Sequence, residues 1–179
     1  MEMENVVLVD SEDNATGLME KMEAHRQALL HRAFSVFLFN DKKEFLLQRR
    51  ALTKYHSPGL WTNTCCSHPR SGETTIVAAN RRLSEEMGLT GELNEIFSFI
   101  YKADVGQGLI EHEFDHVFVG FSNIHPEINR DEVDSWKYMS MVDLQQDMIQ
   151  NPEEYTVWFR IAFERVVAFL LNHKVEGLS

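Results

Sequence analysis

Cysteine is scarce in this chain, which has two, the neighbouring Cys65 and Cys66. Adjacent Cα atoms are about 3.8 Å apart, which is too close for an ordinary disulfide. The sequence therefore predicts free thiols, and free thiols are typical of a reducing compartment. The first residues have no basic stretch followed by a long apolar one, so we expect no secretory signal peptide and a cytoplasmic protein.

Long apolar runs and an excess of positive charge are also absent. No run approaches the roughly 20 apolar residues of a membrane span. The chain has 17 Lys and Arg against 28 Asp and Glu, a net charge of −11, which argues against a general binder of nucleic acid or anionic membranes. We expect neither partner. An anionic small molecule stays compatible with the sequence if positive side chains gather in one pocket.

The pattern of apolar residues predicts one mixed α/β (α+β) domain over residues 1–179. The predicted strands span residues 6–9, 34–39, 45–49, 97–103, 110–121 and 136–139. The second and third of these form a hairpin. The predicted helices span 18–28, 74–87 and 153–172, and another begins after Ser140 and ends before Pro152. Gly88 suits the end of the central helix.

Two short motifs place metal-binding and acidic groups close together. Cys66 and His68 lie two residues apart in a tight turn that ends at Pro69, so a thiol and an imidazole can enter one pocket. Glu111 and Glu113 alternate on a predicted strand, which points both carboxylates to the same face. Two neighbouring anions are costly unless a cation lies between them or one is protonated. This pattern indicates proton transfer near a divalent metal.

Two further histidines, His25 and His31, precede the first long strand. A lone histidine is more often a surface or a satisfied core residue. Together with His68, Glu111 and Glu113, however, they offer three imidazoles and two carboxylates. That set accepts Mn²⁺, Mg²⁺ or Zn²⁺. The alternative, which spacing alone favours, is that the two glutamates are solvated acids on an exposed strand face.

A second acidic set consists of Glu73, Glu85 and Glu86. On a helix, the side chains of residues 85 and 86 point about 100° apart, so one can face a site while the other supports it. Such a helix can hold Mg²⁺ against a diphosphate, and the alternative is a solvated helix face. Six basic residues around these elements are consistent with a diphosphate clamp: Lys21, Arg49, Arg50, Lys54, Arg81 and Arg82.

The run 73–89 resembles the Nudix box, and nearly the whole chain resembles the type I isopentenyl-diphosphate isomerase family. The matching stretches are MEK at 19–21, His25, AFSVFLFN at 33–40, RRALTK at 49–54, SPGLWTNTCCSHP at 57–69 and GLIEHE at 108–113. Two positions depart from the Nudix hydrolase pattern. Ser67 replaces the opening glycine of the box, and Arg82 replaces a glutamate. The change at Arg82 weakens a multi-metal cluster and strengthens diphosphate binding. Both changes favour an isomerase over a pyrophosphohydrolase.

The resemblance implies a Nudix-like fold, with mixed sheet layers packed between helices. It also implies conversion of isopentenyl diphosphate to dimethylallyl diphosphate for isoprenoid biosynthesis, by a monomer or homodimer. The implied catalytic residues are Cys66 and Glu113 on opposite sides of the hydrocarbon tail, Tyr101 beside Glu113, and Trp158 over the tail. The implied ligands of one divalent metal are His25, His31, His68, Glu111 and Glu113. Glu86 would hold Mg²⁺ on the diphosphate. The implied substrate contacts are Lys21, Arg50, Lys54, Arg82 and Trp61.

Two other functions are compatible with parts of the pattern. A Nudix pyrophosphohydrolase would release phosphate and would be indifferent to loss of Cys66. A non-catalytic metal- or nucleotide-binding domain of the same fold would be stabilised by its ligand without turnover. The joint presence of Cys66, Tyr101, Glu113 and Trp158 argues against both. An isomerase must keep a carbocation from water, and we expect residues 18–31 to close over the site.

Overall fold

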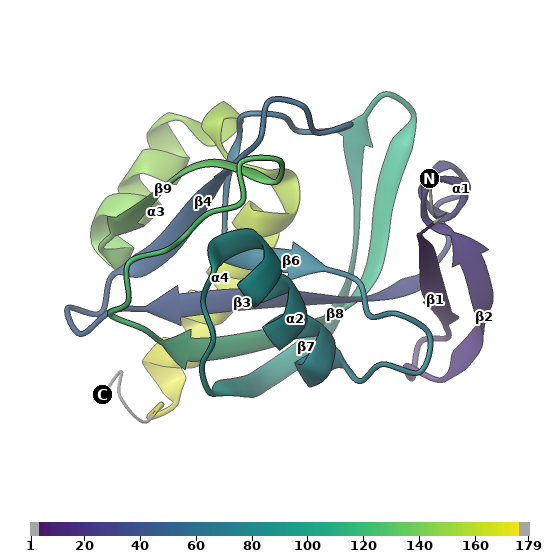
Figure 1. The fold of residues 1–179 in the computed structure, drawn as a ribbon, viewed down its shortest axis with the longest axis horizontal. Helices are drawn as coiled ribbons and strands as arrows, with labels where there is room; N and C mark the ends of the chain where they lie inside the picture. The colour runs from purple at the N-terminus through teal and green to yellow at the C-terminus, as the bar shows by residue number, and fades with distance from the viewer. Residues whose placement is uncertain (1–3, 176–179) are drawn as a thin grey trace.

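The computed structural model describes residues 4–175, so the ends of the predicted domain, 1–3 and 176–179, lie outside it (Figure 1). The strands are β1 (Asn5–Val9), β2 (Ala15–Glu20), β3 (His31–Phe39), β4 (Phe45–Arg50), β5 (Trp61–Thr62), β6 (Cys65–Ser67), β7 (Leu93–Gly106), β8 (Leu109–Phe121) and β9 (Val133–Met139). The helices are α1 (Lys21–Arg26), α2 (Thr75–Met87), α3 (Met141–Gln150), the 3₁₀ helix η1 (Pro152–Glu154) and α4 (Val157–Asn172). The predicted mixed α/β class is confirmed.

Strand β3 is the centre of the sheet. Along its whole length it pairs in parallel with β8, which pairs antiparallel with β7. On its other side it meets β1 at His31, β6 from Phe34 to Val36, and β4 at Phe39. Strand β4 in turn pairs with β5 and β9, and β1 pairs with β2. The strand therefore brings segments from most of the chain to its two edges.

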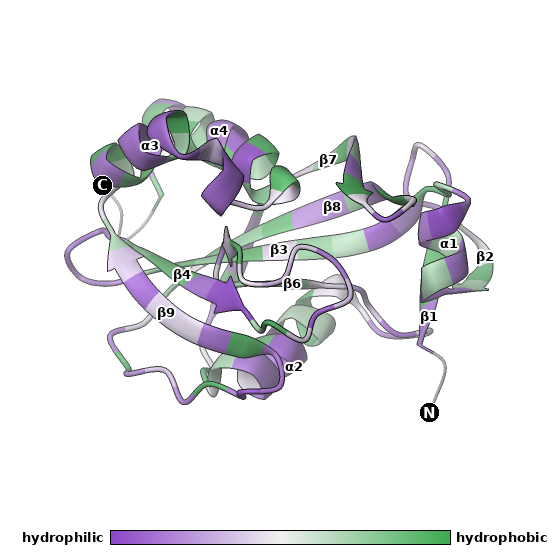
Figure 2. Ribbon diagram, turned by 90° about the horizontal axis from the view of Figure 1, so that it is seen from above, coloured by the Kyte–Doolittle hydropathy of each residue, from purple (hydrophilic) through white to green (hydrophobic). Residues whose placement is uncertain are grey.

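Helices cover both faces of the sheet, with α2 on one side and α3 and α4 on the other (Figure 2). Phe34 and Val36 of β3 pack in a buried cluster with Leu83 of α2. Phe37 packs on the opposite face, in a cluster with Phe159 of α4. This confirms the predicted two-faced strand, which must be apolar on both sides. Each such buried side chain contributes about 1.5–3 kcal/mol.

Two predicted helices are confirmed together with the residues that delimit them. Helix α2 ends at Gly88, whose φ is 63°, a left-handed conformation that favours glycine. A Cβ at Gly88 would also lie 2.6 Å from the carbonyl oxygen of Glu127. At the start of α3, Oγ of Ser140 accepts the backbone N–H of Asp143 at 3.1 Å. Both helices therefore end or begin where the sequence provides the required group.

The predicted helix over residues 18–28 is wrong in its first part. Residues 15–20 form β2, because they pair with β1. The helix begins only at Lys21, because the Glu20 carboxylate accepts the N–H groups of Met22 and Glu23. The turn predicted around Cys66 is also wrong, since this residue lies on β6 and pairs with Ser35 of β3.

The last predicted helix begins later than residue 153. Residues 152–154 form η1, and Tyr155 and Thr156 then adopt extended backbone. This break allows Tyr155 to pair with Trp61 in a β-bridge, so α4 starts at Val157. Strands β7 and β9 begin earlier than predicted, because pairing with β8 and β4 extends them. Within residues 4–175, no helix has the length and apolar character needed to cross a bilayer.

Candidate active site and metal centre

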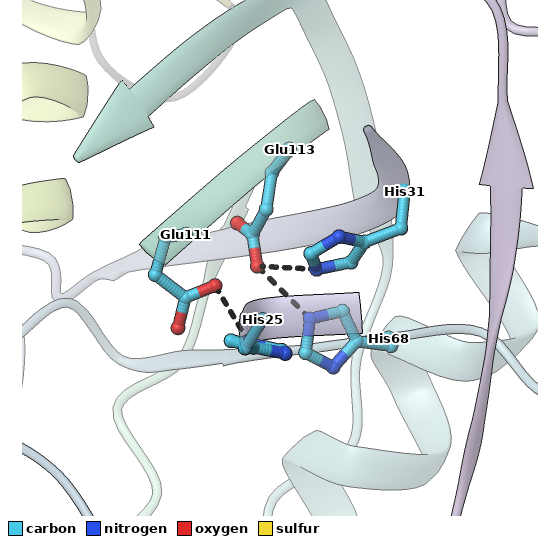
Figure 3. A group of neighbouring side chains, drawn as sticks. All are labelled: His25, His31, His68, Glu111 and Glu113. Atoms are coloured by element: carbon cyan, nitrogen blue, oxygen red, sulfur yellow. Dashed lines mark hydrogen bonds and ion pairs between the residues drawn. The ribbon is translucent and has the colours of Figure 1, made fainter. Parts of the chain in front are cut away.

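Five histidine and glutamate side chains converge near the start of β8 (Figure 3). They come from α1, β3, the segment after β6, and β8: His25, His31, His68, Glu111 and Glu113. All five are buried, and one ligand atom of each lies within 4.8 Å of the others. The alternative that the two glutamates are solvated is wrong, because β8 turns its odd-numbered residues from 109 to 119 inward.

The strand register explains why Glu113 is at the centre of this group. It lies opposite His31 on β3 and opposite Tyr101 on β7. The Tyr101 hydroxyl donates a hydrogen bond to its Oε2 at 2.6 Å. Its other oxygen, Oε1, lies 2.9 Å from Nε2 of His68 and 3.6 Å from Nε2 of His31. A single carboxylate thus contacts side chains from three other segments.

Backbone carbonyl groups orient two of the imidazoles. Nδ1 of His25 lies 2.6 Å from the carbonyl oxygen of Lys21, and Nδ1 of His31 lies 2.8 Å from that of Leu29. Since Nδ1–H donates to a carbonyl oxygen in both rings, Nε2 of each neutral ring carries a free lone pair that faces the cluster. Among the described residues, these two nitrogens and Oε2 of Glu111 have no hydrogen-bond partner.

Such orphaned buried atoms are costly, and a cation between them satisfies all three. Nε2 of His25 and Oε2 of Glu111 are 3.0 Å apart, yet they are not aligned for a hydrogen bond. The donor set of imidazole nitrogens and carboxylate oxygens fits a divalent metal. These five residues could therefore hold one metal ion.

The charges in the cluster also favour a cation. Burial raises the pKa of Glu113, but the neighbouring His31 ring and the Tyr101 hydroxyl outweigh it and hold the pKa below its usual range. Burial and repulsion by Glu113 also raise the pKa of Glu111. His25 and His56 outweigh both effects, so the pKa of Glu111 is lowered. Burial lowers the pKa of His68 well below its usual range, and His31 adds to this effect. Two carboxylates therefore face a neutral His68 ring.

Removing the metal is expected to lower the melting temperature, because its ligands join four separate segments of the chain. At a free metal concentration of about 100 Kd, binding adds ~2.7 kcal/mol to the free energy of unfolding. Thermal unfolding of chelator-stripped protein, with and without added Zn²⁺ or Mn²⁺, measures this difference. A fully stripped protein with an unchanged melting temperature would contradict the site.

A cavity lies beside the cluster, and two kinds of side chain line it. Four of the predicted basic residues line it: Lys21, Arg50, Lys54 and Arg82. Cys66, Glu113, Tyr101 and Trp158 also line it. The two other predicted basic residues do not. Arg49 donates to the carbonyl of Gly59, and Arg81 pairs with Glu73.

The acidic residues Glu85 and Glu86 of α2 point in different directions. Glu86 is buried and lines the cavity, where Arg82 contacts one of its oxygens at 2.5 Å and Gln48 donates to the other at 2.8 Å. Glu85 is exposed and pairs with Arg82 outside the cavity. Neither Glu73 nor Glu85 lines the cavity. Glu86 does, and it could hold a cation beside a bound anion.

The two cysteines have different surroundings. Cys66 lines the cavity, and burial raises the pKa of its thiol, so the thiol is protonated at neutral pH. Cys65 is buried in the cluster that contains Leu83 of α2. The neighbouring positions on β6 thus point to opposite faces, as expected for a strand. This places Cys66 at the site and Cys65 in the core.

The two tryptophans predicted to lie at the site, Trp61 and Trp158, also differ in placement. Trp158 is buried at the cavity wall, and the guanidinium carbon of Arg50 lies 5.1 Å from the centre of its ring. Trp61 does not line the cavity, contrary to the prediction. Its neighbour Thr62 faces the cavity, so on β5 the Trp61 side chain points away and packs under Lys137.

Sequence reasoning missed several residues at the site. His56 lines the cavity, and its Nε2 lies 3.3 Å from Oε1 of Glu111. Glu132, which precedes β9, pairs with Lys54 and with Arg82. Asp115 is buried beyond Glu113 on β8 and accepts a hydrogen bond from Ser35 at 2.8 Å. Asp115 continues the alternation of Glu111 and Glu113, which could have revealed it. No pattern in the sequence distinguishes the others.

The NUDIX domain family matches residues 29–159. The structure is similar to that of DR0079 from Deinococcus radiodurans, with a TM-score of 0.76 and 20% identity over 90% of this chain and 98% of that chain. It is also similar to a MutT protein from Methanosarcina mazei Go1, with a TM-score of 0.65 and 20% identity over 82% and 96% of the two chains. At this identity the likeness concerns the fold alone.

Relatives of higher sequence identity show which group of NUDIX proteins the chain belongs to. The chain is 51% identical to an isopentenyl-diphosphate Delta-isomerase from Pectobacterium atrosepticum, over 98% of both chains. It is 50% identical to isopentenyl-diphosphate Delta-isomerase 2 from Aromatoleum aromaticum, over 92% of this chain and 87% of the relative. The chain belongs to the NUDIX domain family and, within it, to the isopentenyl-diphosphate Delta-isomerases.

Proposed function

We propose that the protein converts isopentenyl diphosphate to dimethylallyl diphosphate. The observation that carries this proposal is the composition of one cavity. It combines Cys66 and Glu113 with four basic side chains suited to a diphosphate. The relatives described above, which bear the name of this reaction, support the proposal over nearly the whole chain.

The basic residues orient the substrate. Arginine and lysine form charge-assisted hydrogen bonds with phosphate oxygens, so the diphosphate is held at Lys21, Arg50, Lys54 and Arg82. The five-carbon tail then extends toward Cys66 and the metal-binding cluster. When bound, Mg²⁺ at Glu86 would neutralise the diphosphate, and Mn²⁺, Mg²⁺ or Zn²⁺ at the His/Glu cluster would supply a positive charge beside the acid.

The reaction needs an acid at one carbon and a base at another, because an unactivated alkene is a weak base. Addition of a proton at C4 leaves a tertiary carbocation at C3. Removal of a proton from C2 then forms the new double bond between C2 and C3. One of Cys66 and Glu113 delivers the first proton and the other removes the second, so the substrate neither gains nor loses a proton overall. Tyr101 holds the Glu113 carboxylate through its hydrogen bond.

Trp158 is expected to stabilise the carbocation through its indole face. Such an interaction contributes about 0.5–2 kcal/mol. The diphosphate would neutralise Arg50, which lies over this ring. We therefore predict that Trp158→Leu lowers kcat by about 2- to 30-fold with little change in KM, and that Trp158→Phe lies between. Steady-state kinetics measures the effect, with Phe163→Leu on the same helix as the control. Equal kcat values for Trp158→Leu and wild type would contradict this role.

The test of the proposed function compares two products. Isopentenyl diphosphate and a series of nucleoside diphosphates are each incubated with the protein, Mg²⁺ and Mn²⁺. Formation of dimethylallyl diphosphate, without release of phosphate from any compound, is the expected result. Phosphate release without any isomer would instead identify a pyrophosphohydrolase.

We also propose where the enzyme acts and in which oligomeric state. The two neighbouring thiols favour the cytoplasm, where the enzyme would serve isoprenoid biosynthesis. We take residues 1–179 as one domain that acts as a monomer or homodimer on a small-molecule diphosphate. Residues 18–31 are our candidate for the segment that keeps water from the carbocation. This segment carries Lys21 at the diphosphate end and His25 and His31 at the metal centre.

A further inference from the structure

His56 lies in the segment between β4 and β5 and is 3% exposed, and the proposed reaction assigns it no role. Its ring contacts the metal centre on one side and the wall of the cavity on the other. We propose that His56 is a positioning residue that holds the Glu111 carboxylate and the Trp158 ring in a fixed relative arrangement. The part that concerns Trp158 rests on the proposed function, and the part that concerns Glu111 does not.

The contact with Glu111 fixes the orientation of a metal-binding carboxylate. Nε2 of His56 lies 3.3 Å from Oε1 of Glu111, whereas Nε2 of His25 lies 3.0 Å from Oε2. The two imidazoles therefore approach different oxygens and restrict rotation of the carboxylate. Nδ1 of His56 lies 3.4 Å from the hydroxyl oxygen of Ser57, which can donate to it. When the hydroxyl donates to Nδ1, the proton of the neutral ring is on Nε2, which faces Glu111.

The contact with Trp158 connects the same ring to the wall of the cavity. The His56 and Trp158 rings meet edge to face, with centres 5.5 Å apart and planes at 88°. Tyr55 meets His56 at 89°, with ring centres 4.5 Å apart. Edge-to-face pairs of this kind are favourable. The imidazole is thus enclosed by two aromatic rings and cannot turn away from Glu111 without losing both contacts.

The backbone around His56 is held separately from its side chain. Arg50 donates hydrogen bonds to the carbonyl oxygens of His56 at 3.1 Å and of Ser57 at 3.2 Å. Ser57 has a φ of 48°, a left-handed conformation that is uncommon outside glycine and that persists only where neighbours hold it. Replacing the imidazole leaves these hydrogen bonds in place. The orientation of Arg50 toward a diphosphate should therefore not change.

The experiment compares His56→Ala and His56→Gln with wild type and with His125→Ala, which alters an exposed histidine. Zn²⁺ affinity is measured by competition with a chromophoric chelator, and kcat and KM are measured with isopentenyl diphosphate. Groups that orient a metal ligand typically contribute about 10- to 100-fold in metal affinity or activity. We expect losses of this size in Zn²⁺ affinity and kcat for His56→Ala, with unchanged KM. Partial recovery is expected in His56→Gln, whose amide can still donate to Glu111.

Two results would overturn the inference. The first is Zn²⁺ affinity in His56→Ala equal to that of wild type. The second is an equal loss of affinity in His56→Gln and His56→Ala, accompanied by the same drop in melting temperature of the metal-free proteins, which would indicate packing alone. Chelator competition requires no turnover. If wild type forms no isomer, the proposed function fails while the comparison of affinities still decides whether His56 positions Glu111.

Discussion

Replacing Cys66 with alanine is expected to reduce isomerisation by about 10²- to 10⁴-fold, the usual contribution of a positioned acid or base. Cys66 lines the cavity and is buried enough to keep its thiol protonated. Alanine removes this exchangeable proton and adds no bulk, so a substrate should still bind. We expect kcat to carry nearly the whole loss, with KM, Zn²⁺ affinity and the melting temperature close to wild type.

The matched control is Cys65→Ala, one position away on the same strand. Its side chain packs in the core with Leu83 rather than in the cavity. Truncation there leaves a small void and should lower the melting temperature slightly without changing kcat. Measuring kcat and KM for the two variants separates a chemical role from a packing role. Equal losses of kcat in both variants, or full activity in Cys66→Ala, would contradict the assignment.

Glu113→Gln is expected to affect metal binding and chemistry together. The amide has the shape of the carboxylate but no negative charge, and its oxygen is too weakly basic to take up a proton from the substrate. Loss of proton transfer costs about 10²- to 10⁴-fold in kcat, and the metal should bind more weakly because an anionic ligand is lost. The Tyr101 hydroxyl, which lies 2.6 Å from Oε2 of the carboxylate, keeps an acceptor if the amide oxygen takes that position.

Two companion variants separate these effects. Tyr101→Phe removes the hydrogen bond but keeps the charge of Glu113, so Zn²⁺ should still bind while kcat falls. Glu153→Gln changes an exposed acid that does not line the cavity and should match wild type. Chelator competition and steady-state kinetics on the same preparations give both quantities. Glu113→Gln with wild-type affinity for the metal and wild-type kcat would exclude it from both roles.

The parts of the fold that sequence reasoning predicted are those with short-range signals. The nearly continuous apolar run over residues 34–39 is visible in the chain, and it forms the strand β3, which is apolar on both faces. Gly88 and Ser140 mark helix boundaries through their own backbone and side-chain chemistry. Strand β2 was missed, because pairing with β1 rather than an apolar pattern holds residues 15–20 in place. Local periodicity therefore predicts an element only when the element itself carries the stabilising pattern.

For the site, the sequence indicated the residues but not how they converge. The pairs Cys66 with His68 and Glu111 with Glu113 are visible as short spacings. His25 and His31 became candidates only in combination with these pairs, and the resemblance then implied that they are ligands. Their convergence depends on the parallel register of β3 and β8, which places His31 opposite Glu113. No short spacing in the sequence reports that register.

Two sets of residues show what the spacing of residues along the chain does not predict. Trp61 and Thr62 are adjacent on β5, and a shift of one residue decides which side chain faces the cavity. His56 and Glu132 lie in irregular segments, where no periodicity indicates a direction. Tertiary packing therefore determines all of these positions. A lone histidine or glutamate in such a segment gives no local signal for its role.

The most direct test of the central claim is a proton NMR time course of isopentenyl diphosphate in D₂O, with Mg²⁺ and Mn²⁺, for wild type and Cys66→Ala. If one group protonates C4 and another deprotonates C2, wild type should produce the dimethylallyl isomer and incorporate deuterium at C4 and C2. Cys66→Ala should show neither the isomer nor this exchange at a comparable rate. An isomer that forms as fast in Cys66→Ala as in wild type, or no isomer with metal-loaded wild type, would contradict the claim.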